Sequence, residues 1–273
     1  MSWLKTILIA LPVLAVAVYF GLPRVLNAMG LHPHYEIPEY DLAGKRALII
    51  ATSQDTLGDT GKATGVFGSE LTVPYYAFLD AGMEVDLVSI KGGEIPVEPR
   101  SMGWPMATDA DYRFKKDTVA MAKLTNSIPV SEVDISKCDA VFLAGGWGAA
   151  YDFAQSEELA ALVTAANADG DVIGSVCHGA LGLVNAKDTD GSPLIEGRRV
   201  TGVTDTQIDQ LGISITPKHP ETELRAAKAN YEAETAFRDM FANHVTVDGR
   251  LVTGQNQNSG AEAAHRMMEL LSK

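Results

Sequence analysis

Short apolar segments alternate with helical patterns along most of the chain, and this alternation limits the possible folds more than any other feature. Four segments rich in β-branched or apolar residues are expected as strands, at 47–51, 84–89, 140–143 and 172–176. A helical pattern follows three of them, at 70–81, 156–168 and 180–185. Strands that are apolar on both faces are typical of a parallel sheet covered by helices on both sides. We therefore expect a doubly wound, mostly parallel α/β domain over residues 45–273.

The C-terminal part of the sequence predicts a hairpin and a closing helix. Asp248-Gly249 stands between two expected strands, at 244–247 and 251–253, and this dipeptide favours a tight turn. Apolar residues then recur at helical spacing over 260–271, which predicts a helix that closes the domain.

Three segments show no regular apolar pattern. Residues 25–44 contain two prolines and are predicted to be a linker that leads into the domain. The stretches 96–131 and 220–241 are expected as excursions from the sheet. The second of these is polar and is a candidate cap.

The N-terminal segment is apolar enough to enter a membrane. Residues 6–23 carry no charge, with Lys5 before them and Arg24 after them. A helix needs roughly 17 to 25 apolar residues to span a bilayer, so we expect residues 1–24 to be a single-pass anchor. A signal peptide cleaved on export is the alternative, because the Ala-Val-Ala sequence at 15–17 resembles a cleavage site. The single flanking Lys and Arg leave the membrane orientation open.

The charge and the cysteine content exclude some classes of function. A formal net charge of -13 repels phosphate backbones, so nucleic acid is not an expected partner. The two cysteines, Cys138 and Cys177, lie in dissimilar surroundings and are expected to be free thiols. Small neutral or weakly charged substrates are compatible with this composition.

Cys177 lies where an expected strand turns sharply into a helix. The sequence at 171–181, Asp-Val-Ile-Gly-Ser-Val-Cys-His-Gly-Ala-Leu, is typical of a nucleophile elbow. Amides at a helix start stabilise negative charge on sulfur, so we expect this thiol to ionise easily. The alternative is an inert buried cysteine. His178 follows directly, and its ring either folds back to the sulfur or merely packs.

Two further segments are expected near the same edge of the sheet. Gly145, Gly146 and Trp147 follow the expected strand at 140–143, and freed amides in such a turn can hold an oxyanion. Glu70 stands at the start of a helix that follows the first strand. A glutamate in a first helical turn is common, so Glu70 is a candidate functional residue only if it lies close to Cys177.

Several motifs in order resemble the ThiJ/PfpI superfamily, within the flavodoxin-like, class I glutamine amidotransferase-like fold. The similarity is greatest to the branch of heat-shock chaperones and glutathione-independent glyoxalases. It covers nearly everything from residue 45 onward and rests on 64–74, 81–89, 145–152, 176–179, 197–202 and 248–256.

The resemblance implies a function for these residues. Cys177 would be the nucleophile, Glu70 the proton shuttle, and His178 the histidine of a dyad, while the turn at Gly146 and Trp147 would supply an oxyanion site. The substrate would be a small reactive aldehyde such as methylglyoxal, converted to lactate as by a D-lactate dehydratase, without glutathione, cofactor or metal. The resemblance also leaves a homodimer open.

The sequence departs from the family pattern at two positions. Trp147 stands where the family often has histidine. The acid of a Cys-His-acid triad is expected shortly after residue 202, where Ile208 stands, so Asp205 and Asp209 are the candidates. If neither serves, thiol chemistry driven by Glu70 is favoured over a triad hydrolase. Another cysteine-dependent hydrolase or hydratase, and a non-catalytic chaperone or redox sensor, are the alternatives.

Overall fold

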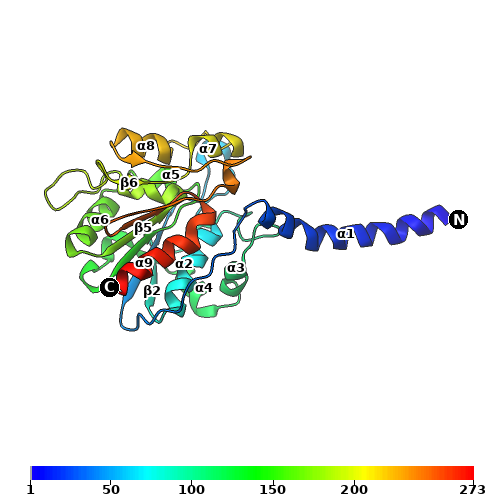
Figure 1. The fold of residues 1–273 in the computed structure, drawn as a ribbon, viewed down its shortest axis with the longest axis horizontal. Coiled ribbons are helices and arrows are strands. Elements are labelled where there is room, and N and C mark those ends of the chain that lie inside the picture. The colour runs from blue at the N-terminus through cyan, green and yellow to red at the C-terminus, as the bar shows by residue number, and fades with distance from the viewer. Residues whose placement is uncertain (1) are drawn as a thin grey trace.

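A mostly parallel sheet of seven strands organises the chain, of which the computed structural model describes residues 2–273 (Figure 1). The strand order is β3-β2-β1-β4-β5-β9-β8, and only β8 runs antiparallel to its neighbour. The bounds are β1 Arg46–Ala51, β2 Glu84–Ser89, β3 Ile128–Pro129, β4 Ala140–Leu143, β5 Val172–Val176, β8 Val245–Asp248 and β9 Leu251–Gly254. The expected mostly parallel α/β fold is thereby confirmed.

The strands expected from the sequence agree closely with those in the structure. The strands β2, β4 and β5 have the expected bounds, and β1 begins one residue earlier than expected. The predicted hairpin is present, with Gly249 at a φ of 60° in the turn between β8 and β9. The edge strand β3 was not expected, because a segment of two residues leaves no pattern in a sequence.

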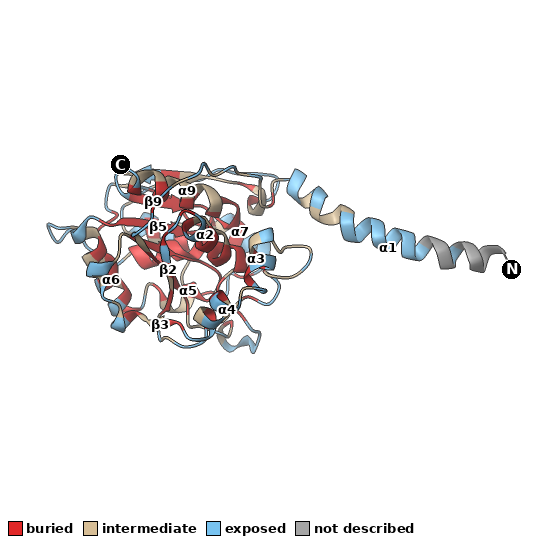
Figure 2. Ribbon diagram, turned by 90° about the horizontal axis from the view of Figure 1, so that it is seen from below, coloured by how far each residue is buried: buried red, intermediate tan, exposed pale blue. Residues whose placement is uncertain are grey.

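Helices cover both faces of the sheet. On one face, α2 (Gly68–Asp80) packs against α9 (Gly260–Leu271), which has the bounds expected from the sequence. The other face carries α5 (Ala149–Asp152) and α6 (Glu157–Asp169). Buried residues gather in the sheet and on the inner sides of these helices (Figure 2). This is the two-sided burial that continuous apolar strands require.

Each of the two excursions from the sheet contains helix. The first contains α3 (Asp109–Phe114) and α4 (Thr118–Thr125) before it reaches β3. The second begins with α8 (Pro220–Ala226), and α7 (Asp205–Leu211) lies between β5 and that excursion. In Figure 1 these last two helices lie together at one side of the sheet. Of the two, α7 contributes Gln207 and Leu211 to the cavity that Cys177 lines.

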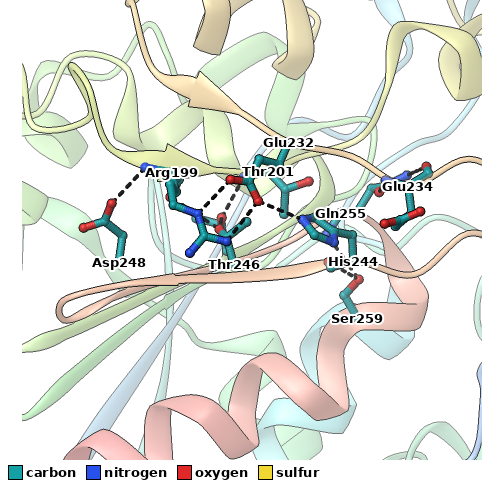
Figure 3. A network of polar contacts seen from close by, with 10 residues as sticks. Arg199, Thr201, Glu232, Glu234, His244, Thr246, Asp248, Gln255 and Ser259 are labelled. Carbon is teal, nitrogen blue, oxygen red and sulfur yellow. Dashed lines mark hydrogen bonds and ion pairs between the residues drawn. The ribbon is translucent and has the colours of Figure 1, made fainter.

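A polar network holds the second excursion against the β8–β9 hairpin (Figure 3). Glu232 follows the short strand β7 (Asn230–Tyr231), which pairs with β6 (Arg199–Val200). Its carboxylate accepts from Arg199 Nε at 2.7 Å and lies 3.4 Å from His244 Nε2. The contacts join a long connection to the sheet.

The N-terminal helix α1 (Ser2–Ala28) projects from the α/β domain (Figure 1). Its window Leu11–Ala28 has a mean hydropathy of 1.5, and none of the window is buried. The indole N–H of Trp104 donates to the Tyr19 carbonyl oxygen at 3.0 Å. After the helix, the expected linker packs along the domain, where Leu31 and Leu42 are buried.

Candidate active site

The backbone at Cys177 has the strained geometry of a nucleophile elbow. β5 ends at Val176, and Cys177 follows with a φ of 57°, a region that residues with a Cβ rarely adopt. The next segment is a 3-10 helix, η4 (Cys177–Leu183), in place of the α-helix expected at 180–185. A Cβ added to Gly179 would lie 2.1 Å from the Leu143 carbonyl oxygen, so the turn requires glycine there.

Glu70 comes from the first turn of α2 and meets Cys177 inside the domain. Its side chain is buried, and its carboxyl lies close enough to the Cys177 thiol for each group to shift the pKa of the other. Burial raises the pKa of Glu70 to about 8, although the bonds to the thiol and to the backbone of Gly145 oppose the rise. This carboxyl therefore holds or releases a proton close to neutral pH.

The thiol of Cys177 does not have the depressed pKa expected from its place at a helix start. Burial raises the pKa of Cys177 above its ordinary value, and the neighbouring Glu70 carboxylate raises it further. Hydrogen bonds from the backbone of His178 and Gly146 lower the pKa but do not offset burial. The expectation of an easily ionised thiol was wrong, because desolvation outweighs the amides of one short 3-10 turn.

His178 folds back onto the sulfur, one of the two orientations left open by the sequence. Its Nδ1 lies 3.5 Å from Cys177 Sγ, and the side chain is buried. Burial lowers the pKa of His178 to about 3, with His219 as a smaller contribution of the same sign. The imidazole is therefore neutral at physiological pH. Its Nε2 finds no hydrogen-bond partner among residues 2–273.

Neither candidate acid bonds to that imidazole. Asp205 accepts a hydrogen bond from Thr222 Oγ1 at 2.7 Å, and Asp209 accepts one from Ser214 Oγ at 2.5 Å. The side chain of Ile208, between them, is fully buried. Within the described part of the chain, the site is a Cys177–His178 pair with Glu70, and no carboxylate orients the histidine.

The turn after β4 brings backbone amides to the sulfur. Gly146 has a φ of 102°, and a Cβ there would lie 2.4 Å from the Gly65 carbonyl oxygen. A Cβ on Gly145 would lie 2.5 Å from Glu70 Oε2. Both positions therefore require glycine, which lets the turn approach Glu70 and Cys177 closely. Trp147 follows and forms part of the wall of the site.

These residues face a cavity of about 230 Å³ at the carboxyl edge of the parallel strands. Ligands bind at this edge in open α/β sheets. The lining combines Glu70, Gly146, Trp147, Cys177 and His178 with residues that the sequence did not single out: Phe67, Glu98, Arg100, Met106, Val203, Gln207, Leu211, Met240 and Gln257. These come from five separate segments, and no spacing in the sequence could have linked them.

Comparisons with known proteins agree with this architecture. The glutathione-independent glyoxalase HSP31 of Saccharomyces cerevisiae is 32% identical over 241 residues, which cover 84% of this chain and 99% of that protein. Glyoxalase 3 of Candida albicans is 29% identical over 227 residues, covering 81% of this chain and 95% of that protein.

Solved structures of related proteins have a similar fold. The Rapid Encystment Protein of Francisella tularensis superposes with a TM-score of 0.78 at 32% identity, covering 84% of this chain and all of that one. The crystal structure of glyoxalase III from Candida albicans gives a TM-score of 0.75 at 28% identity, over 83% of this chain and 97% of that one. A family model for the DJ-1/PfpI family matches residues 62–270. The chain therefore belongs to the DJ-1/PfpI family.

Proposed function

We propose that this protein is a cysteine-dependent, glutathione-independent glyoxalase that converts methylglyoxal to D-lactate. The observation that carries the proposal is that Cys177 and Glu70 line the same cavity and lie close enough for each group to shift the pKa of the other. The glyoxalases among its relatives, similar over nearly their whole length, support it.

The raised pKa values of the pair suit the addition of a thiol to an aldehyde. Because the Cys177 thiol keeps its proton at rest, sulfur bonds to the aldehyde carbon while that proton passes to the aldehyde oxygen. The product is a neutral hemithioacetal. Backbone amides at Gly146 and His178, which already bond to the sulfur, would stabilise negative charge that develops on the oxygen.

Glu70 then moves a proton between adjacent carbons. As a carboxylate it accepts the proton of the hemithioacetal carbon, and the electron pair left behind forms an enediolate with the former ketone oxygen. The carboxyl returns the proton to the neighbouring carbon, and the hydroxyl proton of the hemithioacetal carbon passes to the oxygen of that neighbouring carbon, which leaves a thioester on Cys177. Water cleaves that thioester to give lactate and the free thiol. A carboxyl with a pKa of about 8 is suited to accept and to release this proton near neutral pH.

The alternatives expected from the sequence lack a supporting observation. A triad hydrolase needs an acid on His178, and Asp205 and Asp209 bond elsewhere. A redox sensor needs a low-pKa, accessible thiolate, whereas burial raises the pKa of Cys177.

The test is the full-length protein in detergent with methylglyoxal, with D-lactate measured enzymatically. We expect product from the wild type and from Cys138→Ala, and none from Cys177→Ala. Cys138 is a matched control because it is also a free cysteine and lies outside the cavity. The absence of D-lactate from the wild type, or equal amounts from Cys177→Ala, would exclude the proposal.

We also propose that α1 anchors this enzyme in a membrane. The helix is apolar, exposed and N-terminal, as an anchor would be. A cleaved signal sequence has the same features, so the membrane topology needs an experiment of its own.

A further inference from the structure

The cavity at Cys177 is more apolar than methylglyoxal requires. Nearly all the surface that its lining residues present to it is apolar. That surface comes from the residue before α2, the turn after β4, the α7 segment and both excursions. The residues are Phe67, Met106, Trp147, Val203, Leu211 and Met240. A small, strongly hydrated dicarbonyl gains little from such walls, because the favourable free energy of burial scales with the apolar area of the ligand.

The two amide side chains of the lining are already hydrogen-bonded within the protein. Gln257 Nε2 donates to the Met240 carbonyl oxygen at 2.8 Å, and Gln207 Oε1 accepts from Asn256 Nδ2 at 3.1 Å. Arg100 is largely exposed and lies 4.0 Å from Glu98. The hydrogen bonds hold the two amides in place, and the buried polar side-chain atoms of the lining that have no hydrogen-bond partner among the described residues belong to Glu70, His178 and Glu98. These atoms are available to receive the polar end of a substrate.

The size of the cavity also exceeds what methylglyoxal fills. An apolar cavity of roughly 150 Å³ is large enough to bind benzene. The present cavity, at about 230 Å³, has room for a dicarbonyl group together with a hydrocarbon group of several carbons. The catalytic pair would hold the dicarbonyl, and the apolar walls would hold the hydrocarbon.

We infer that the preferred substrates of this site are 2-oxoaldehydes that carry an apolar chain longer than methyl, a proposal that rests on the glyoxalase function above. The reaction is the same for any chain. The aldehyde carbon is oxidised to a carboxylate, the ketone carbon is reduced to an alcohol, and one water is added. No oxidant, reductant or other co-reactant is needed.

The experiment compares kcat/KM for methylglyoxal, propylglyoxal and pentylglyoxal, whose dicarbonyl groups have similar intrinsic reactivity. We expect kcat/KM to rise by about fourfold for each methylene group until the cavity is full. Met240→Gln places an amide in the wall and should flatten this rise, whereas the matched variant Met240→Leu should keep it.

The outcomes separate this inference from the function on which it rests. If methylglyoxal is converted and longer chains are no better, the inference is wrong and the glyoxalase proposal stands. If no 2-oxoaldehyde is converted, both are wrong. If kcat/KM rises with chain length equally in the wild type and in Met240→Gln, then the wall at Met240 does not bind the hydrocarbon chain, which contradicts the inference.

Discussion

Cys177 and Glu70 take their chemical character from burial as much as from their residue types. Both side chains are nearly inaccessible, and in each case burial disfavours the charged form and raises the pKa. The sequence could suggest that the two residues meet, but not how little water would reach them. A thiol expected to ionise easily is therefore a neutral thiol beside a proton-holding carboxyl.

Burial of Glu70 should make the stability of the protein depend on pH. The unfolded chain ionises this group near its ordinary pKa of 4.5, whereas the folded chain keeps the proton up to about pH 8. The wild type therefore loses unfolding free energy as pH rises through that interval. Glu70→Gln has no such proton to lose. We predict that it gains stability over the wild type between pH 4.5 and 8, by a few kcal/mol at about 1.4 kcal/mol per pKa unit.

Urea unfolding of both proteins across that pH range measures the effect, because the other titrating groups largely cancel in the difference. A difference between Glu70→Gln and wild type that stays constant with pH would show that Glu70 ionises normally in the folded chain.

Replacement of Asp205 or Asp209 should have little effect on activity. Removing the acid of a true triad lowers kcat by about four orders of magnitude. Because Asp205 bonds to Thr222 and Asp209 to Ser214, we predict that Asp205→Asn and Asp209→Asn stay within a few-fold of the wild-type kcat/KM. A loss greater than a hundredfold in either variant would mean that this aspartate does orient His178.

The elbow shows which features of an element can be read from a sequence. Its location was predictable, because a buried strand followed by Cys-His-Gly leaves a recognisable pattern. The positive φ of Cys177 and the 3-10 geometry of η4 were not, since they follow from how closely the turn after β4 approaches. The position of the His178 ring could not be predicted either, because it depends on tertiary contacts and not on sequence spacing.

The close approach at Gly179 should be sensitive to a single methyl group. A Cβ there would overlap the Leu143 carbonyl oxygen, which belongs to the backbone and cannot move aside cheaply. We predict that Gly179→Ala lowers the unfolding free energy by about 1 to 3 kcal/mol. Gly103→Ala is the matched control, since its Cβ would find only the Arg100 carbonyl oxygen, at 3.9 Å. Equal stability of the two variants by urea unfolding would contradict this account of the turn.

The whole molecule places the cavity at the carboxyl edge of its parallel strands, as the alternation of strands and helices predicted. The walls of that cavity could not be predicted, because Met106 and Met240 lie in the two excursions that carry no regular pattern. The helix α1 projects from the domain (Figure 2), which it contacts through Tyr19 and Trp104, and it contributes no described residue to the cavity at Cys177. Function and membrane attachment can therefore be tested separately.

Membrane attachment through α1 predicts a clear fractionation result. The full-length protein should stay in the membrane pellet after alkaline carbonate extraction, and a variant without residues 1–24 should be released. Intact-mass measurement shows whether the N-terminus is retained. Release of the full-length protein, or a mature chain that begins after Ala17, would favour a cleaved signal peptide instead.

The most direct test of the catalytic account is a double-mutant cycle on Cys177 and Glu70, with kcat/KM for methylglyoxal as the measurement. Residues that act as one unit give losses that do not add. We predict that Cys177→Ala, Glu70→Gln and the double variant all fall to the same residual activity, at least about a hundredfold below wild type. Near-wild-type activity of Glu70→Gln, or losses that multiply in the double variant, would contradict the account.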